Sequence, residues 1–516
     1  MSGSGSHDHV LTRAITGVVL IGVAARAFAY LSNRSLWLDE AMIALNIGQR
    51  SFGELIGRLD FNQAAPLGFL WLEKLAVVVL GPGERALRLW PLLASFATLV
   101  VFAILARRLL GPLAAVGTLA LLALSTSQVY YGAEVKQYAF DVLCAAALLL
   151  VPLGRSSRVP EGAGVDPASR WWALGLAGAL AVWFSHPAVF LLPGVALYVA
   201  TAPRRGSGSW RPLLIVGVSW GLSFALAYSA SAREASTSPL MAQFWADGFM
   251  PLLPASREDL AWFGGAAAGW IRGTFDFSET ISPVRTAAIW VGGILAGLGA
   301  VRGWVEHRRE VCLVALPILL ALVASALRRY PFEGRLILFL VPSTLLLMGW
   351  GLDATATLAR ARTKRVGGVL AWSVTAAMPS LAAVVLVAWL ANPRREELRP
   401  VLQALAGRAR PDDVVYMHSG AQHAHLYYER ACETCRIDAR VVRGAFPLED
   451  AAAIEAEIAR LPPEGRVWMV FSHSWWGYGD IERRLLVEQL GERAIRVDSV
   501  TAVGARAYSF DFGGTE

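Results

Sequence analysis

The sequence predicts an all-α polytopic membrane protein with about eleven transmembrane helices and a small α/β domain at its C-terminal end. Apolar residues make up 55% of the 516 residues, charged residues make up only 17%, and the mean hydropathy is +0.47. Soluble domains carry about 25% charged residues, so this composition indicates repeated membrane crossings. Apolar runs of spanning length recur up to residue 391, and beyond that point the composition becomes that of a water-soluble domain.

Eleven apolar runs have the length and composition of membrane-spanning helices. They cover residues 10–31, 87–106, 112–129, 138–153, 171–185, 187–202, 212–230, 285–303, 311–327, 335–352 and 367–391. A further run, 65–81, is short and carries Glu73 and Lys74 at its middle. We expect this run to form a helix that lies in the outer membrane interface instead of crossing.

Basic residues orient these spans. If 65–81 does not cross, the arginine-rich short connectors all fall on one side, which the positive-inside rule makes cytoplasmic. The chain then starts inside and ends outside, as in a multi-pass protein of a bacterial inner (plasma) membrane whose active face is periplasmic. The net charge of +7 and the pI of about 9.4 thereby set the membrane orientation and indicate no nucleic-acid partner.

This topology predicts two parts. Residues 1–391 form the transmembrane module, whose outer loops 32–86 and 231–284 are too long to be turns and form a cap, the second with amphipathic interfacial helices. Residues 392–516 form a periplasmic α/β domain in which short strands and helices alternate. The predicted strands are 412–418, 466–473 and 494–500, and the predicted helices are 421–430, 449–461 and 480–491.

A histidine and cysteine cluster lies in the C-terminal domain. It consists of His418, His423, His425, Cys432 and Cys435. These residue types at this spacing are compatible with a zinc site. In an oxidising periplasm the two cysteines could equally form a disulfide, with the histidines as ordinary surface residues.

Ionisable residues near the spans are the candidates for function, because each costs a few kcal/mol unless it has a partner or a water-filled cavity. Asp39 and Glu40 form an adjacent acidic pair after the first span. Such a pair can cap the following helix, activate a hydroxyl or bind a metal.

The connector before the fourth span carries Glu134 and Lys136 among three tyrosines that include Tyr131 and Tyr138. A helical reading aligns Glu134 and Tyr138 with Asp141 on one face. Either this is a reactive cluster, or it is a salt-bridged helix end with an aromatic anchor.

Three arginines, Arg328, Arg329 and Arg335, lie in the outer loop before the tenth span, against the positive-inside preference. Arg335 begins the span, where it could form a bidentate pair with a phosphate. The alternative is binding of lipid headgroups without catalysis. His186, in an outer turn between two spans, is either a turn residue or part of the substrate pocket.

Acids and bases therefore converge on one membrane surface under a cap. This arrangement suits a reaction between a lipid phosphate ester and a hydroxyl acceptor. Arg335 and Lys136 would hold the phosphate while a carboxylate takes the proton of the hydroxyl.

Five sequence strings carry a family resemblance between residues 10 and 350. In chain order they are SLWLDEA, QAAPLGFLWL, ERALRLWPLL, YYGAEVKQYAFD and YPFEGRLILFLVP. With these strings the chain resembles the GT-C glycosyltransferases, specifically the bacterial, glycosyltransferase family 39-like branch related to lipid A aminoarabinose transferases and protein O-mannosyltransferases. The resemblance does not extend to the C-terminal domain.

The resemblance implies a membrane glycosyltransferase that moves a monosaccharide from a polyprenyl-phosphate donor to a hydroxyl of a periplasmic glycan, lipid or protein. A single displacement would invert the anomeric carbon. The implied catalytic residues are Asp39, as base or acceptor-orienting group, Glu40 and Glu134. The implied donor-phosphate residues are Lys136, Arg335, Tyr138 and Arg329, and the implied substrate-pocket residues are His186, Gln63 and Tyr131.

No cofactor is required by this chemistry, although Asp39 and Glu134 could hold a divalent cation, Mg²⁺ or Mn²⁺. Two other functions stay open, a lipid-linked sugar transporter or flippase and a noncatalytic envelope-assembly protein. Transporters tend to show inverted repeats and polar groups near the midplane. Here the in-span charges, Arg26 and Asp141, both lie near the outer end.

Overall fold

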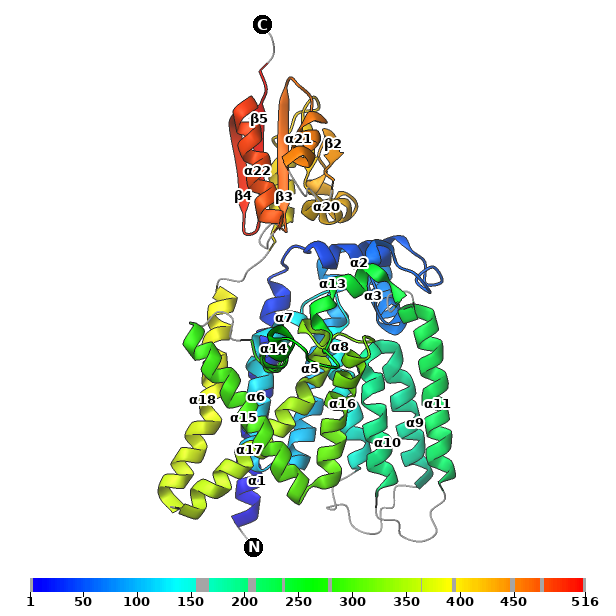
Figure 1. Ribbon diagram of the computed structural model, residues 1–516, viewed down its shortest axis with the longest axis vertical. Coiled ribbons are helices and arrows are strands. Elements are labelled where there is room, and N and C mark those ends of the chain that lie inside the picture. Colours follow the sequence, from blue (N-terminus) through cyan, green and yellow to red (C-terminus); the bar gives the residue numbers. More distant parts are fainter. Residues whose placement is uncertain are drawn as a thin grey trace.

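The computed structural model describes residues 3–154, 167–202, 210–233, 237–276, 281–362, 364–391, 396–445, 451–473 and 478–513. A bundle of long helices forms one part, and a small domain of strands and helices stands on one end of it (Figure 1). The membrane helices and the C-terminal α/β domain that the composition predicts are both confirmed.

The helical part runs from residue 3 to residue 391. The helices that coincide with predicted spans are α1 (Gly3–Leu31), α5 (Leu89–Leu109), α6 (Pro112–Leu124), α8 (Tyr138–Leu150), α9 (Pro167–Phe184), α10 (Leu192–Ala200), α11 (Arg211–Ala227), α15 (Ser282–Glu306), α16 (Arg308–Ala326), α17 (Val341–Arg362) and α18 (Lys364–Ala391). The other elements are α2 (Leu38–Gln49), η1 (Asp60–Asn62), α3 (Leu67–Leu80), α4 (Glu84–Leu87), α7 (Thr126–Tyr131), η2 (Val151–Leu153), η3 (His186–Phe190), η4 (Tyr228–Ala232), α13 (Pro239–Phe244), η5 (Ala246–Gly248), α14 (Arg257–Thr274) and η6 (Gly334–Leu340).

Seven helices among the described residues are long and apolar enough to cross a membrane, and each coincides with a predicted span. Four shorter apolar helices coincide with the remaining predicted runs, so the total of eleven crossings stays a prediction. Large apolar side chains such as Leu222, Trp290 and Val384 are 63%, 68% and 67% exposed on the bundle surface. Lipid contact explains this exposure in a multi-pass membrane protein.

The predicted span 112–129 is wrong in one respect, because the helix is interrupted. α6 ends at Leu124, Ser125 is extended, and α7 begins at Thr126. Arg26 of α1 binds at this break: it is 1% exposed and donates to the carbonyls of Leu122 and Ala123 at 3.0 and 2.9 Å. A buried guanidinium thus pairs with carbonyl oxygens at the end of α6.

Close backbone contact joins α15 to α17. A Cβ atom at Gly299 would lie 1.7 Å from the carbonyl oxygen of Leu347, and one at Gly351 would lie 2.1 Å from that of Leu295. Only glycine fits at such a crossing, which is the usual way for membrane helices to approach closely. This contact fixes α17, whose N-terminal extension η6 carries Arg335.

α2 and α13, from the segments predicted to be outer, lie at the end of the bundle that faces the C-terminal domain, and α14 lies beside α7 near that end (Figure 1). Helices α13 and α14 occur in the predicted amphipathic loop 231–284, and α3 corresponds to the run predicted to lie in the interface. That α3 lies in the membrane interface and does not cross the membrane stays a prediction.

The C-terminal part contains a five-stranded sheet. The strands are β1 (Val414–Met417), β2 (Arg440–Arg443), β3 (Arg466–Ser472), β4 (Ile495–Ala502) and β5 (Ala505–Asp511), in the order β2-β1-β3-β5-β4. β1 is parallel to both β2 and β3, with Tyr416 opposite Met469, whereas β5 is antiparallel to β3 and β4. The helical elements are α19 (Leu398–Ala406), α20 (Ser419–Ala431), η7 (Glu433–Cys435), α21 (Ala451–Ala459) and α22 (Tyr478–Arg493). The sequence prediction missed β2, β5 and α19.

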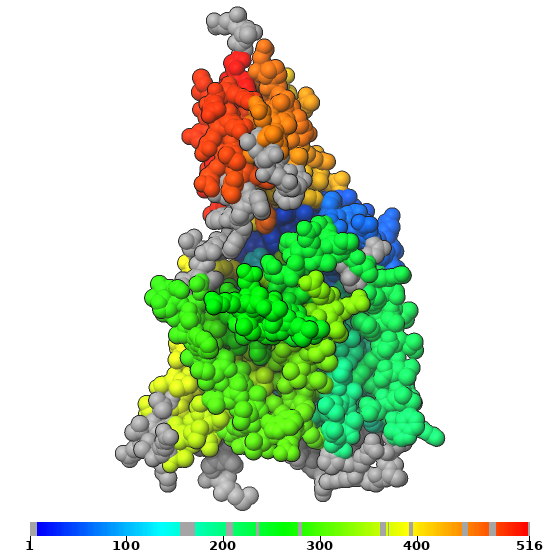
Figure 2. Space-filling model, in the orientation of Figure 1, coloured from blue at the N-terminus to red at the C-terminus, as the bar shows by residue number. Residues whose placement is uncertain are grey.

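This domain is seated on the outer loop 32–86 (Figure 2). Helix α20 packs on α2, and one apolar core continues from α2 and α3 into α19, α20 and the sheet. The Leu36 amide donates to the Tyr428 hydroxyl at 2.7 Å, and Tyr428 donates to Glu84 at 3.0 Å. Ser35 donates its amide and hydroxyl to Glu397 at 3.1 and 2.9 Å.

The two cysteines of the C-terminal domain form a disulfide bond, Cys432–Cys435, which was one of the two alternatives for this cluster. His418 pairs with Glu482 at 2.8 Å, and the His423 ring contacts Phe61 with 4.6 Å between ring centroids. The described residues hold no group of three or more His, Cys, Asp or Glu side chains placed for a metal ion. Of the two alternatives for this cluster, the structure therefore shows the disulfide.

Candidate active site

Asp39 lies between two cations at the outer end of the bundle. It stands in the first turn of α2 and pairs with Lys136 Nζ at 2.9 Å and with Arg335 Nη2 at 2.9 Å. Lys136 also donates to the Gln63 side chain at 2.6 Å. Four residues that are distant in sequence and were predicted for the site are thus brought together.

The charge state of Asp39 follows from these contacts. Burial opposes its ionisation, but Lys136 and Arg335 outweigh burial and lower the pKa of Asp39 to about 2. A carboxylate with so low a pKa is a weak proton acceptor at neutral pH. The contacts of Asp39 are those of a residue that holds Lys136 and Arg335 in place.

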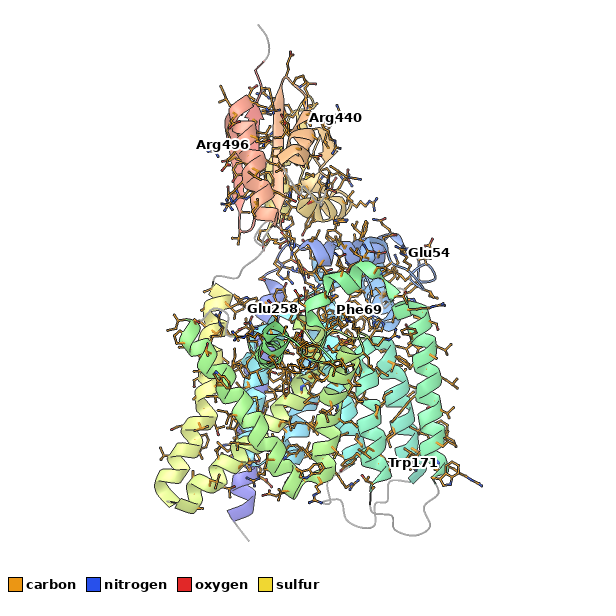
Figure 3. The ribbon with its side chains drawn as sticks, viewed as in Figure 1. Glu54, Phe69, Trp171, Glu258, Arg440 and Arg496 are labelled. Carbon is orange, nitrogen blue, oxygen red and sulfur yellow. A yellow bond between two sulfur atoms is a disulfide. The ribbon has the colours of Figure 1, made fainter. Side chains whose placement is uncertain are left out.

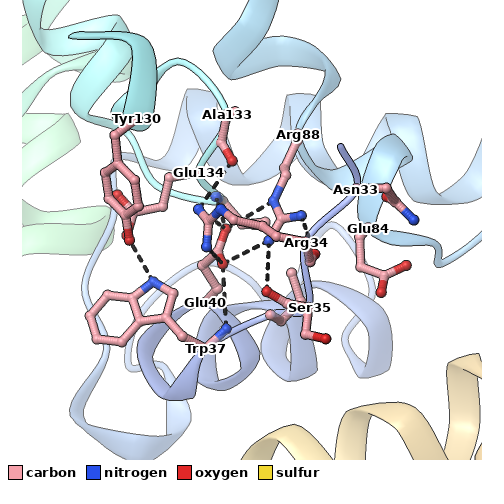
Figure 4. Close-up of polar contacts among 12 residues, drawn as sticks. Asn33, Arg34, Ser35, Trp37, Glu40, Glu84, Arg88, Tyr130, Ala133 and Glu134 are labelled. Carbon is pink, nitrogen blue, oxygen red and sulfur yellow. Dashed lines mark hydrogen bonds and ion pairs between the residues drawn. The ribbon is translucent and has the colours of Figure 1, made fainter. Parts of the chain in front are cut away.

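Glu40, the residue after Asp39, lies against two arginines, Arg34 and Arg88 (Figure 4). It is fully buried and pairs with Arg34 and Arg88, each at 2.8 Å. Its Oε1 also accepts a hydrogen bond from the Val135 amide at 2.9 Å. Glu40 therefore joins the outer loop to the connector that carries Glu134, and the sequence prediction of a catalytic group at this position stays untested.

Glu134 does not lie on a helix, so the predicted helical face that includes it is wrong. Residues 132–137 form turns, and α8 begins only at Tyr138. Glu134 is fully buried, and its Oε1 accepts a hydrogen bond from the indole N–H of Trp37 at 2.9 Å. Burial and then the charge of Glu40 raise the pKa of Glu134 to about 7, although Arg34 and Arg335 oppose the shift.

Stability is expected to depend on pH through Glu134. Because its folded-state pKa of about 7 exceeds the ordinary 4.5, the carboxyl contributes stability that is complete below pH 4.5 and is lost as the pH rises through 7. Glu134→Gln should remove that loss and stabilise the protein at pH 8 by about 1–3 kcal/mol, with little change at pH 4. Thermal unfolding of the wild type and of Glu134→Gln at pH 4 and pH 8 measures this difference, with Glu258→Gln, a change at an exposed residue, as the control. An equal shift of the unfolding midpoint at both pH values would contradict the prediction.

Arg335 is surrounded by aromatic rings. Its Cζ lies 5.6 Å from the ring centroid of Trp37, 5.7 Å from that of Tyr138 and 5.9 Å from that of Trp245. Tyr131 packs edge-on against Tyr138 at 5.2 Å. These rings fix the guanidinium beside Asp39, and cation–π contact stabilises its charge.

A cavity of about 1200 Å³ opens beside this cluster. Its wall comes from the segment before α2, from α7, η5, α14, η6 and the end of α18, and from the C-terminal domain. The lining residues are Arg34, Trp37, Thr126, Ser127, Tyr130, Tyr131, Asp247, Gly248, Trp262, Gly265, Ala266, Gly269, Arg272, Gly273, Asp276, Phe332, Glu333, Gly334, Arg335, Leu338, Trp389, Glu396 and His473. Of the predicted donor-phosphate residues, Arg335 is the one that lines this cavity, whereas Lys136 is only 5% exposed behind Asp39.

Two predicted residues lie apart from the cluster. His186, in η3, shares a hydrogen bond of 3.1 Å with Ser231 and is not part of the cavity wall. Arg329 is exposed at the end of α16 and does not line the cavity either.

A divalent cation held by Asp39 and Glu134 stays a prediction, and both carboxylates already have partners in the structure. Both oxygens of Asp39 face cations, and the indole of Trp37 donates to Glu134. The described part of the chain also places no third acidic, histidine or cysteine ligand beside them in a metal-binding group.

Sequence reasoning missed Trp37, Glu396 and His473. Trp37 contacts Arg335, Glu134 and His473. Its sequence position did not reveal this, because tryptophans are common at membrane boundaries as part of the aromatic belt. Glu396 and His473 lie beyond the membrane part, where the sequence offers no sign that they return to it.

The chain has the GT-C membrane fold that the sequence resemblance implied, because its structure is similar to those of solved proteins with this fold. ArnT from Cupriavidus metallidurans in the apo state is similar with a TM-score of 0.54 and 15% identity, over 96% of this chain and 98% of that chain. ArnT bound to undecaprenyl phosphate gives 0.50 and 16%, over the same shares of the two chains. The apo Archaeoglobus fulgidus oligosaccharyltransferase gives 0.51 and 11%, over 96% of this chain and 74% of that chain. No family model and no curated protein matches the sequence.

Proposed function

We propose that the protein is a glycosyltransferase that moves a monosaccharide from a polyprenyl-phosphate donor to a hydroxyl acceptor on a glycan, lipid or protein. The observation that carries this proposal is the position of Arg335, which lines the cavity at the outer end of the bundle and is held by Asp39. A donor lipid presents its phosphate at that level while its chain stays in the membrane. The ArnT structure with undecaprenyl phosphate supports this class of donor. We place the reaction on the periplasmic side of a bacterial inner membrane.

The residues divide the work as follows. Arg335 binds a phosphate oxygen of the donor, and Asp39 keeps Arg335 and Lys136 fixed so that their positive charge meets the growing charge of the leaving group. The acceptor oxygen attacks the anomeric carbon, and the electron pair of the broken bond stays on the phosphate. Because a phosphate monoester has a second pKa near 6, it leaves without a general acid. One displacement inverts the anomeric carbon.

The purified full-length protein in proteoliposomes, with a panel of polyprenyl-phosphate sugars and a membrane extract as acceptor, tests this function. We expect sugar transfer with inversion and an unchanged rate in EDTA. Arg335→Gln should lower the transfer rate about 100-fold. The exposed Arg440→Gln, on the C-terminal domain (Figure 3), should leave it unchanged. Movement of the lipid across the membrane without sugar transfer would overturn the proposal in favour of a flippase, and product with a retained anomeric configuration would overturn the single displacement.

A further inference from the structure

The C-terminal domain places an ion-paired histidine in the wall of the cavity. His473 directly follows β3, at the carboxyl end of the parallel strands, and its Nδ1 shares a hydrogen bond of 2.7 Å with Glu396 Oε1. Both residues line the cavity. His473 also has a φ of +54°, a left-handed conformation that non-glycine residues rarely adopt and that is concentrated at functional sites.

Trp37 connects this pair to the Asp39 cluster. The His473 and Trp37 rings lie 5.8 Å apart between centroids, and the same indole lies 5.6 Å from Arg335 Cζ. Thus the histidine from the C-terminal domain and the arginine from the membrane part contact one ring. An acceptor in the cavity can approach His473 while the donor phosphate lies on Arg335.

The three predicted carboxylates are poorly placed to take the proton of an acceptor. Glu40 is fully buried and pairs with Arg34 and Arg88. Asp39 is held by two cations. Glu134 is fully buried and is not part of the cavity wall. His473 is 34% exposed, and its Nε2 has no hydrogen-bond partner within the part of the chain that the structure describes. A histidine whose other nitrogen bonds to a carboxylate has its tautomer fixed, and its charged form is stabilised.

We propose that His473, oriented by Glu396, is the catalytic base for the acceptor hydroxyl, an assignment that rests on the proposed glycosyltransferase function. As the acceptor oxygen bonds to the anomeric carbon, the hydroxyl proton passes to His473 Nε2. The bond from the anomeric carbon to the phosphate oxygen breaks, and its electron pair leaves with the polyprenyl phosphate as a dianion. Glu396 balances the imidazolium until the proton passes to water.

The charges around His473 give the direction of its pH dependence. Burial alone would lower the pKa of His473, but the hydrogen bond and charge of Glu396 raise it, helped by Asp39 and opposed by Arg335. A base works in its neutral form, so the transfer rate should rise with pH and level off above the pKa of His473. Glu396→Gln should lower this pKa, which moves the rise to lower pH and lowers the plateau.

The test compares four variants of the full-length protein in proteoliposomes. They are His473→Ala, Glu396→Gln, Glu134→Gln and the control His423→Gln, which changes a histidine of the same domain that contacts Phe61 outside the cavity. The measurements are sugar transfer from a polyprenyl-phosphate donor that the wild type uses, binding of that donor, the pH profile and the effect of added imidazole.

General bases contribute about 10²–10⁴-fold to a rate, so we expect His473→Ala to transfer sugar about 100-fold more slowly than the wild type while its donor binding is unchanged. Added imidazole should raise the transfer rate of this variant at least about tenfold. His423→Gln should match the wild type. Transfer by His473→Ala within about twofold of the wild type, or loss of donor binding together with transfer and no rescue by imidazole, would overturn the assignment. If Glu134→Gln lost sugar transfer while His473→Ala kept it, the catalytic base would be Glu134 and not His473. If the wild type transfers no sugar from any donor, the proposed function falls as well.

Discussion

Asp39→Asn is expected to lower sugar transfer at least about 100-fold in a protein that still folds. Asparagine keeps the size of the side chain but removes the charge that faces Lys136 and Arg335, each at 2.9 Å. Without that charge the two cations repel each other and leave the positions in which they would stabilise the leaving phosphate. The initial rate of transfer in proteoliposomes measures the effect, and thermal unfolding verifies the fold.

Asp60→Asn is the matched control for this variant. Asp60 lies in the same outer loop and pairs with Arg50 at 2.8 Å, but its side chain is 62% exposed. We expect wild-type transfer from this control. Full transfer by Asp39→Asn would refute the requirement for a carboxylate at this position.

Glu40→Gln should cause the largest loss of stability, about 3–5 kcal/mol. The carboxylate is fully buried between Arg34 and Arg88, and it accepts hydrogen bonds from both guanidinium groups and from the Val135 amide. Glutamine keeps the shape but leaves the buried Arg88 and the largely buried Arg34 without the carboxylate that pairs with both. Breaking a buried ion pair by neutralising one partner leaves an uncompensated charge in a medium of low dielectric.

The midpoint of thermal unfolding in detergent, followed by tryptophan fluorescence, measures this loss. Glu54→Gln is the control, because Glu54 lies exposed in the outer loop (Figure 3). A midpoint for Glu40→Gln equal to that of Glu54→Gln would show that the buried triad contributes little. A drop in transfer without a drop in the midpoint would instead point to a catalytic task for Glu40.

The membrane part of the fold could be predicted well because crossing a bilayer demands long apolar runs, which a sequence shows directly. The helix break at Ser125 could not be predicted in this way, since it depends on Arg26 reaching the freed carbonyls from another helix. The strands β2 and β5 were missed as well. Their pairing depends on neighbours across the sheet more than on their own composition.

The candidate site could be predicted in part. Charges on one membrane face pointed to Asp39, Lys136 and Arg335, and the structure brings these three together. The helical spacing that linked Glu134 to α8 was misleading because the connector turns before α8 begins. His473 was out of reach, since its contact with Trp37 joins residues from opposite ends of the chain.

The seat of the C-terminal domain on the outer loop also determines when the cavity wall can be completed during synthesis. Leu36 bonds to Tyr428 across 392 positions of sequence, and Ser35 bonds to Glu397 across 362. During synthesis the segment beside Asp39 emerges early, but its partners emerge only after the last membrane helix. A chain that ends before the C-terminal domain therefore lacks the part of the cavity wall that Glu396 and His473 supply.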